Sequence, residues 1–554
     1  MVTITFFVAI IRIIASVLLF VIARDTTRFI TMAYAVTARD LNLFMSEQYH
    51  PLYALLIYCW HFVFPGWVQA AKAAALAMSV AGVFPVYMLC ADLFGKKTGR
   101  ICAILFAVHP YVVRFGVDGL SESTYTFLLM FGLWIGYRAM RSRGLASILL
   151  FASGGVLFSL AYLTRPEGVG GFLVIVLATL VYGLKKNSLH IAQRIGRVCV
   201  IGLAFTLFTT PYLYMIQQYT GEWRFTQKKA MRDFVPHAIG QYFLTYPDKD
   251  SQKKQAVSPA VPETKPQPET PEHSVSQDQA AETVVQEEVR SEKPEPVSKN
   301  QRKSFYSKKI VPALEVLNTF INTLNPLLFC FFLAGMGMYI RSPKTQDQRL
   351  LSFILFSAMV LYLYVLYSLA SHHYVSKRHL LPVALLALPF AAHGICRISE
   401  LRALWKRFPA KIAPLTVIMV ICALVLLPKA LKPQRANKMY LKEIGKWINA
   451  QEDTSGVFAV DDSRIPFYAQ LDFVVVPRST MKYEQWLDFL AKNQVRYVLT
   501  EKEFIEMYFL NLEQSLTNDV IKLKSIYKST DNKNGAVEYC LYEYFPPDSV
   551  YRDR

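Results

Sequence analysis

The sequence has few charged residues for its length. Only 18% of its 554 residues are Asp, Glu, Lys or Arg, whereas 53% are hydrophobic and 14% are aromatic. Soluble domains carry about 25% charged residues, so this composition excludes a disordered chain and an ordinary cytosolic enzyme. A membrane span requires about 20 apolar residues. The composition therefore predicts a polytopic α-helical membrane protein.

Several motifs are also missing. None of the eight cysteines forms a Cys-x-x-Cys pair, so neither a zinc site nor a disulfide framework is indicated. The sequence contains no glycine-rich phosphate loop. Its net charge is +19, but most lysines and arginines lie in short loops between apolar runs rather than along one polar face. This pattern is typical of the positive-inside rule and argues against a nucleic-acid partner.

The apolar runs predict about eleven transmembrane helices. Five basic loops, each two spans apart, would share the cytoplasmic face, which places the N-terminus inside. Lys429, Lys432, Arg435 and Lys438 follow the last span on the external side and break this rule. Arg12 interrupts the first span, and we favour a structural role for it. The expected spans are 4–23, 67–94, 101–113, 120–138, 145–162, 168–184, 198–216, 324–340, 350–370, 379–396 and 412–428.

Four parts are expected along the chain. Residues 1–245 form a membrane core with an external loop at 24–66. Within this loop, segment 51–64 is too short to span the membrane and is interpreted as an interfacial or re-entrant helix. Its Tyr53, Tyr58 and Trp60 suit the headgroup level. Residues 246–305 are rich in Pro, Glu, Gln, Ser, Thr and Lys and are predicted to be a disordered insert. Residues 306–428 hold the remaining spans. Residues 429–554 form a small external α/β domain.

The C-terminal domain shows alternating strand and helix patterns. We expect strands at 456–460, 472–477, 495–499, 521–529 and 536–545, and a helix at 483–493. Asp461 and Asp462 follow the first strand. A solvated loop pair is the favoured interpretation of these two residues, ahead of a metal site.

Ionisable residues near the external membrane surface are the main candidates for function. Asp25 lies between Arg24 and Arg28, whose charge would keep it ionised, and such a carboxylate can accept a proton from an acceptor hydroxyl. Simple charge balance at a helix end is an equal alternative.

A second group is Arg114, Asp118 and Glu122. Their spacing would place them on one helix face, where they could bind a metal, an acceptor or a phosphate, or form a structural ion-pair ladder. In the next external turn, Arg165 could bind phosphate oxygens or pair with Glu167.

A third group combines His372, His373 and His379 with Lys377 and Arg378. Three histidines and two cations near the membrane suit a lipid phosphate. A metal site is the less favoured alternative, because adjacent histidines have awkward ligand geometry and no cysteine is near.

Several of these residues fall within an ordered set of motifs, over about residues 10–215. They are Arg-Asp at 24–25, Tyr-His-Pro-Leu-Tyr at 49–53, Leu-Phe-Gly-Lys-Lys-Thr-Gly-Arg at 93–100, His-Pro-Tyr at 109–111, Asp-Gly-Leu-Ser-Glu-Ser at 118–123 and Leu-Ala-Tyr-Leu-Thr-Arg-Pro-Glu-Gly at 160–168. Their succession resembles bacterial glycosyltransferase family 39-type proteins of the GT-C superfamily. That superfamily includes the protein O-mannosyltransferases and the aminoarabinose lipid A transferase.

The resemblance implies a GT-C fold in the bacterial inner membrane. It also implies inverting transfer of a sugar from a polyprenyl-phosphate donor to an acceptor hydroxyl on the external face, with Asp25 as the general base. The sequence departs from many relatives after this aspartate, where it reads Thr-Thr-Arg-Phe. The resulting assignments are catalytic Asp25, Glu122 and Asp118; donor phosphate-binding Arg165, Lys377, Arg378 and Arg28; and acceptor- or sugar-binding His50, Tyr53 and Glu167.

Other readings stay open from the sequence. No metal ligand is assigned, although a divalent metal is an open alternative, and the acceptor could be a lipid, a glycan or a protein. A transporter or flippase for a polyprenyl-linked glycan would favour internal repeats and polar residues in mid-membrane, which the sequence lacks. A non-catalytic membrane scaffold would leave Asp25, Glu122 and Arg165 without a purpose.

Overall fold

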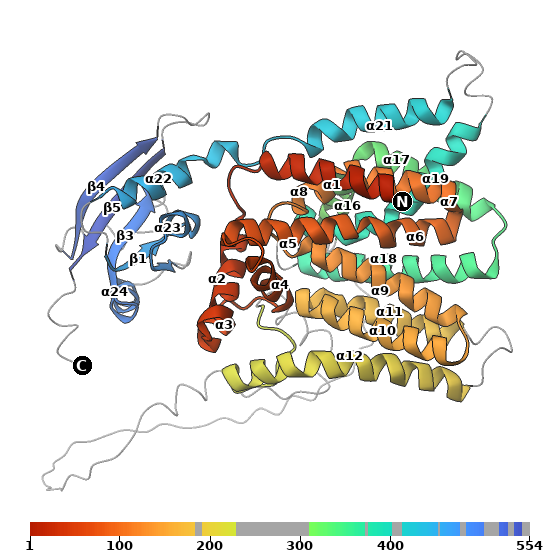
Figure 1. The fold of residues 1–554 in the computed structure, drawn as a ribbon, viewed down its shortest axis with the longest axis horizontal. Coiled ribbons are helices and arrows are strands. Elements are labelled where there is room, and N and C mark those ends of the chain that lie inside the picture. The colour runs from red at the N-terminus through yellow and green to blue at the C-terminus, as the bar shows by residue number, and fades with distance from the viewer. Residues whose placement is uncertain are drawn as a thin grey trace, which may run out of the picture.

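The computed structural model describes residues 1–182, 191–228, 310–371, 375–401, 413–451, 455–476, 483–502, 520–529 and 537–545. The predicted disordered insert at 246–305 lies outside the described residues, and so do His372 and His373. Figure 1 shows a bundle of long helices with a smaller sheet domain beside one of its ends.

The bundle is built from helices of very different lengths. In chain order they are α1 (Val2–Val17), α2 (Arg24–Ala38), α3 (Leu41–Ser46), α4 (Leu52–His61), α5 (Trp67–Ala81), α6 (Val83–Phe94), α7 (Lys96–Val108), α8 (Pro110–Phe115), α9 (Glu122–Arg141), α10 (Gly144–Thr164), η1 (Pro166–Gly168), α11 (Val169–Tyr182), α12 (Ile191–Thr220), α16 (Val311–Leu324), α17 (Pro326–Arg341), α18 (Gln346–Ala370), α19 (Lys377–Glu400) and α21 (Pro414–Ala430).

Among the described residues, five helices are long and apolar enough to cross a membrane: α5 with α6, α10, α12, α18 and α19. A sixth is added if α16 and α17, which meet at an angle of 100°, form one broken span. The chain is thus a multi-pass membrane protein, but the predicted number of eleven spans is not confirmed. Three expected spans are shorter apolar helices, namely α1, η1 with α11, and α21. The segment that was expected to be too short to span contains α4, which is also a shorter apolar helix.

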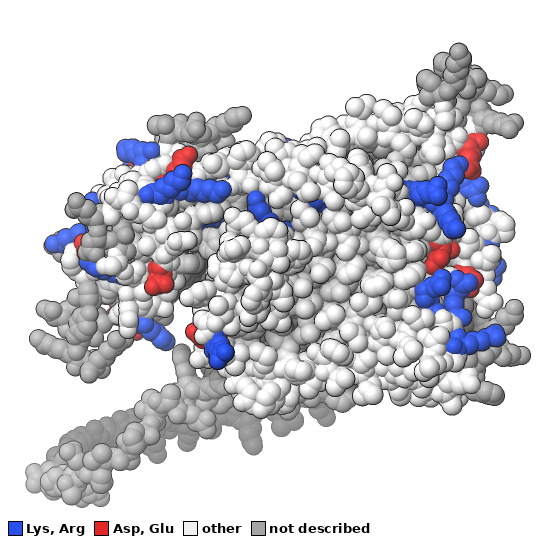
Figure 2. Space-filling model, in the orientation of Figure 1, with Lys and Arg blue, Asp and Glu red and all other residues white. Residues whose placement is uncertain are grey.

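On the face shown in Figure 2, charged residues lie mainly at the two ends of the molecule. Figure 2 shows Lys and Arg gathered at the end away from the sheet domain, beyond a broad belt without charge. Two ion pairs join helix ends at this basic end. Arg141 lies 2.7 Å from Asp347, and Lys97 lies 3.4 Å from Glu400. Within the described residues, the basic helix ends that the sequence places on one face of the membrane therefore lie at one end of the structure.

Arg12 stabilises a break between α7 and α8. Pro110 has no N–H, so it cannot bond the carbonyl four residues earlier, at Phe106. Arg12 is fully buried and donates to the carbonyls of Phe106 (3.2 Å) and Ala107 (2.7 Å) and to Ser79 Oγ (2.9 Å). The predicted structural role of Arg12 is confirmed.

The core of the bundle depends on close helix contact between α17 and α19. A Cβ on Gly335 would lie 2.0 Å from the carbonyl oxygen of Phe390, and one on Gly394 would lie 2.1 Å from that of Phe331. Small residues of this kind let membrane helices approach at backbone distance. This contact fixes α19, whose first turn carries part of the candidate site.

The sheet domain contains five strands in the order β2-β1-β3-β5-β4. Strands β2 (Phe473–Val475), β1 (Val457–Val460) and β3 (Val495–Glu501) are parallel, whereas β5 (Val537–Tyr544) is antiparallel to both β3 and β4 (Ile521–Ser529). Helices α22 (Tyr440–Asn449), α23 (Arg464–Ala469) and α24 (Tyr483–Lys492) complete the domain. All five predicted strands and the predicted helix at 483–493 are confirmed within a few residues.

Side chains alternate between the two faces of this sheet, as the period of a strand requires. Phe458 and Val460 pack with Ile444 of α22, whereas Ala459 packs with Trp486 of α24. The prediction of a solvated Asp461–Asp462 pair is wrong. Asp461 is 5% exposed, and Asp462 is held by Arg464 at 2.5 Å, because the loop after β1 is covered by the bundle.

The sheet domain is joined to the bundle by hydrogen bonds around the linker that precedes α22. The N–H of Gln434 donates to Leu18 O (2.9 Å), and the N–H of Phe20 donates to Gln434 O (3.2 Å). The N–H of Ile22 donates to the Tyr468 hydroxyl in α23 at 3.1 Å. The domain therefore rests against the segment that leads into α2.

Candidate active site

Asp25 lies in the first turn of α2, where a carboxylate is favoured by the helix dipole. Three contacts fix this turn. Arg24 donates to Asp461 O in the sheet domain (2.6 Å), the Thr26 hydroxyl donates to Asp118 O (2.9 Å), and the Thr27 and Ser463 hydroxyls are 3.0 Å apart. Both the bundle and the sheet domain thus position the segment that presents Asp25.

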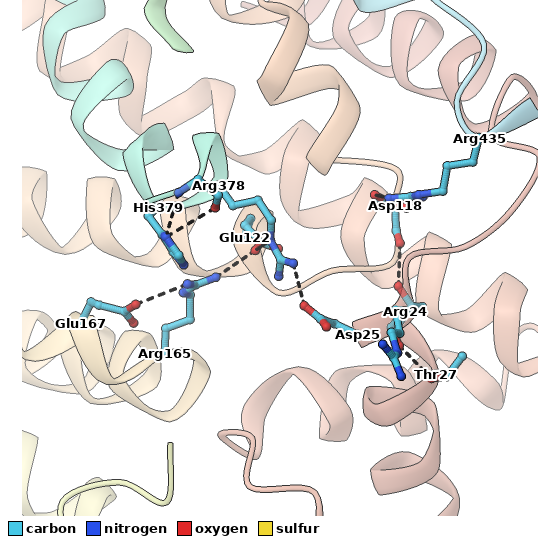
Figure 3. Close-up of polar contacts among 12 residues, drawn as sticks. Arg24, Asp25, Thr27, Asp118, Glu122, Arg165, Glu167, Arg378, His379 and Arg435 are labelled. Atoms are coloured by element: carbon cyan, nitrogen blue, oxygen red, sulfur yellow. Dashed lines mark hydrogen bonds and ion pairs between the residues drawn. The ribbon is translucent and has the colours of Figure 1, made fainter. Parts of the chain in front are cut away.

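Arg378 joins Asp25 to Glu122 (Figure 3). Its Nη1 donates to Asp25 Oδ2 and its Nε donates to Glu122 Oε1, each at 2.6 Å. Arg378 lies in the first turn of α19, and Glu122 is the first residue of α9. Three helix ends that are far apart in sequence therefore meet through one guanidinium.

The network continues from Glu122 to Arg165 and Glu167. Arg165 Nη1 donates to Glu122 Oε1 (2.9 Å), and Arg165 Nη2 donates to Glu167 Oε1 (3.3 Å). Arg165 is 7% exposed and packs over the Tyr125 ring. Of the two predicted uses of Arg165, pairing with Glu167 is present, and Glu122 is a second partner.

Asp25 is ionised near neutral pH. Burial alone would raise the pKa of its carboxyl, but Arg378, with Arg28 and Lys228, lowers that pKa overall. Its side chain retains 29% exposure. A charged and accessible oxygen is what a proton acceptor requires.

Asp118 lies apart from this network. The expected single helix face for Arg114, Asp118 and Glu122 is wrong, because α8 ends at Phe115 and α9 begins only at Glu122. Gly119 occupies the turn between them with φ of +67°, and a Cβ there would lie 2.7 Å from Thr26. The Asp118 carboxylate is fully buried and accepts two hydrogen bonds from Arg435.

His50 and Tyr53 are packed into the protein. His50 is fully buried, its Nε2 lies 3.0 Å from the Thr226 hydroxyl, and burial lowers its pKa to about 3. Tyr53 is also fully buried and donates to Ala71 O at 2.9 Å. The Tyr53 side chain is thus enclosed by protein, because α4 packs against α2.

The two remaining predicted cations lie outside the Asp25–Arg378–Glu122 network. Arg28 is 3.7 Å from Glu47 and stacks near Tyr49, and its side chain is 41% exposed. Lys377 is exposed and lies over the Tyr111 ring. Neither contacts the Asp25–Arg378–Glu122 network directly.

Two cations without a predicted role in the sequence contribute to this region, one inside the network and one beside it. Lys228 lies over the Tyr49 ring (5.5 Å), and its charge acts on Asp25 and Glu167. Burial first, and then repulsion from Arg165, lowers the pKa of the Lys228 ammonium to about 8. Arg435 is the second. One sequence feature could have pointed to Arg435, namely its place among the predicted external cations that break the positive-inside rule. A charge in such a position requires a partner.

The carboxylates do not form a metal cage. Asp25, Glu122 and Glu167 are each neutralised by an arginine, and within the described ranges no group of three His, Cys, Asp or Glu side chains is arranged to hold a metal ion. These carboxylates would have to break their ion pairs with the arginines before their oxygens could bind a divalent cation. His379 instead caps α19 with Ser376. The described residues do not fit a metal.

Solved structures share this fold, although no family model and no curated protein match the sequence. ArnT from Cupriavidus metallidurans in the apo state matches with a TM-score of 0.54 and 12% identity over 97% of both chains. The same protein bound to undecaprenyl phosphate gives 0.52 and 13%, again over 97% of both. The Archaeoglobus fulgidus oligosaccharyltransferase gives 0.53 and 11% over 99% of this chain and 74% of that chain. The chain therefore shares the overall fold of these two solved proteins, as the sequence predicted for its membrane bundle and C-terminal domain.

Proposed function

We propose that this chain is a membrane-embedded glycosyltransferase that moves a sugar from a polyprenyl-phosphate donor to an acceptor hydroxyl with inversion. The observation that carries the proposal is the Asp25–Arg378–Glu122 network, in which an ionised, accessible carboxylate stands beside clustered cations at one end of a GT-C bundle. The neighbour with undecaprenyl phosphate bound supports the donor class.

Asp25 is the general base of this proposal. The acceptor oxygen attacks the anomeric carbon as its proton passes to Asp25, and the bond from that carbon to the phosphate oxygen breaks with its electron pair leaving on the phosphate. Attack from the side opposite the leaving group inverts the anomeric centre. The lowered pKa of Asp25 keeps it ready to accept a proton at neutral pH.

The cations serve the leaving phosphate. The carboxylates of the site are surrounded by Arg378, Arg165 and Lys228. A donor phosphate would replace some of the carboxylate oxygens that these cations contact. Guanidinium groups bind phosphate oxygens in pairs, and stabilising the charge that develops on a leaving group commonly contributes more to the rate than any other single effect. Figure 3 draws Arg165 and Asp25 on opposite sides of Glu122, which supports separate phosphate and acceptor sides.

The proposed location is the bacterial inner membrane. The basic end of the bundle would face the cytoplasm under the positive-inside rule, and the sheet domain and Asp25 would then face outward. The polyprenyl tail would lie against the uncharged belt of the bundle.

The test compares wild type with Asp25→Asn. Purified proteins in detergent receive labelled sugars on a small panel of polyprenyl phosphates, with an envelope extract as acceptor. We expect Asp25→Asn to slow transfer by about 10²- to 10⁴-fold, with unchanged elution as a folded protein. Asp40→Asn, at an exposed position beyond the end of α2, is the matched control. Full activity of Asp25→Asn would exclude the assigned base.

A further inference from the structure

A large cleft separates the sheet domain from the helices around α2. Its volume is about 1180 Å³, and it is lined on one side by residues of α2, α3 and α5 and on the other by α23 and β2. Ligand pockets for drug-sized molecules hold about 300–1,000 Å³. This cleft therefore has room for more than one sugar ring.

The cleft reaches the helical turn that carries the base. Thr27 and Arg28, which follow Asp25 by two and three residues, both line it. Residues three apart on a helix lie on neighbouring faces. A molecule bound in the cleft can thus bring one end beside Asp25 while the remainder lies between the two domains.

Aromatic rings are present on both walls. Tyr34 and Trp67 meet edge to face at 6.2 Å on the α2–α5 side, and Phe473 of β2 lies on the opposite side. Tyr34 is 52% exposed even though it is a large aromatic residue. Exposed rings offer flat apolar surfaces that suit the C–H faces of sugar rings.

The polar groups of the lining are mainly neutral. Gln48, Gln69 and Gln470 contribute carboxamides, and Thr31 and Ser46 contribute hydroxyls. A carboxamide both donates and accepts hydrogen bonds, and so does a hydroxyl. This combination matches a ligand that is dense in hydroxyl groups.

Charge argues against an anionic ligand. Among the lining residues that the structure describes, Arg28 is the sole cation, and Glu47 neutralises it at 3.7 Å. Asp472 adds a negative charge to the opposite wall. A phosphorylated lipid head group or an acidic glycan would meet repulsion here rather than the arginine cluster that such anions prefer.

We infer that this cleft binds the acceptor, and that the acceptor is a neutral oligosaccharide or polysaccharide chain. The inference rests on the proposed function, since it names the acceptor of that transfer. The aromatic walls hold successive sugar rings, the carboxamides bind their hydroxyls, and the terminal hydroxyl is delivered to Asp25.

The experiment offers four acceptor preparations from the source envelope: neutral polysaccharide, acidic polysaccharide, extracted lipids and delipidated protein. We expect wild type to move labelled sugar into the neutral polysaccharide. Trp67→Ala, Gln69→Ala and Phe473→Ala should each raise the acceptor concentration for half-maximal transfer by at least about fivefold, as the loss of one aromatic or hydrogen-bond contact predicts. The donor concentration for half-maximal rate should change much less.

Trp223→Ala is the matched control, because Trp223 is 65% exposed and is not among the residues lining the cleft. Label found only in lipid, protein or acidic polysaccharide would overturn the inference and leave the proposed function standing. The same holds if the three cleft variants behave like Trp223→Ala, or if wild type only hydrolyses the donor. Failure of wild type to cleave any donor would instead contradict the proposed function itself.

Discussion

Arg435 binds Asp118 with both terminal nitrogens of its guanidinium and so ties the linker of the sheet domain to the turn between α8 and α9. The same guanidinium donates to Val21 O at 3.0 Å. Asp118 in turn accepts from Thr26 through its main-chain oxygen. The pair thus supports the turn of α2 that holds Asp25, although neither residue touches the Arg378 network.

Removing Arg435 should destabilise the whole assembly. Asp118 is fully buried, so Arg435→Ala leaves an uncompensated charge, which costs about 3–5 kcal/mol. We expect a clear fall in the thermal midpoint of the detergent-purified protein and a partial recovery in the double variant Asp118→Asn with Arg435→Ala. Lys432→Ala, an exposed neighbour, is the control. Equal stability of Arg435→Ala and Lys432→Ala would contradict a structural role for the Arg435–Asp118 pair.

Arg378 and Lys377 are adjacent cations with different surroundings. Arg378 bridges two carboxylates, whereas Lys377 lies exposed over Tyr111. We expect Arg378→Ala to lower kcat/KM for the donor by about 10²- to 10³-fold, and Arg378→Lys to restore little, because an ammonium lacks the paired donors of a guanidinium. Lys377→Ala should have a smaller effect. A loss in Lys377→Ala as large as that in Arg378→Ala would argue against the assigned phosphate site.

Donor binding should weaken in mildly alkaline solution. The pKa of Lys228 is lowered to about 8, so the ammonium is present below that pH and is lost as pH rises through it. Each pH unit above 8 should raise the donor KM by up to about tenfold where this charge is required. Lys228→Arg keeps its charge and should flatten the profile in steady-state assays from pH 7 to 10. Identical profiles for wild type and Lys228→Arg would show that Lys228 does not contact the donor.

Asp461 should make stability depend on pH in the opposite sense to most carboxylates. Burial, and then Asp462 and Glu501, raises its pKa to about 7, so the folded protein holds a proton that the unfolded chain has released. The free energy of unfolding therefore falls as pH rises from about 4 to 7, by about 2–4 kcal/mol for this group. Asp461→Asn should reduce that fall in thermal unfolding at several pH values. Asp488→Asn, at an exposed position of α24, should reproduce wild type.

Local pattern accounts for what the sequence predicted well. The strands of the sheet domain follow from alternation of side chains over a few residues, and the membrane class follows from composition. Arg12 was recognisable as structural because a charge in an apolar helix requires buried partners. The number of spans was harder, because breaks at Pro110 and at Asn325 divide apolar runs into short helices.

The chemical groups of the site can be identified from the sequence: a carboxylate between two arginines at 24–28, an acid at 122 and cations at 165 and 378. Which of these groups meet depends on the packing of the helices. Asp25 and Arg378 are 353 residues apart, and Asp118 and Arg435 are 317 apart. No local pattern encodes such pairs. They form because helix packing brings distant segments of the chain together. A buried charge in the packed structure is stable only beside its partner.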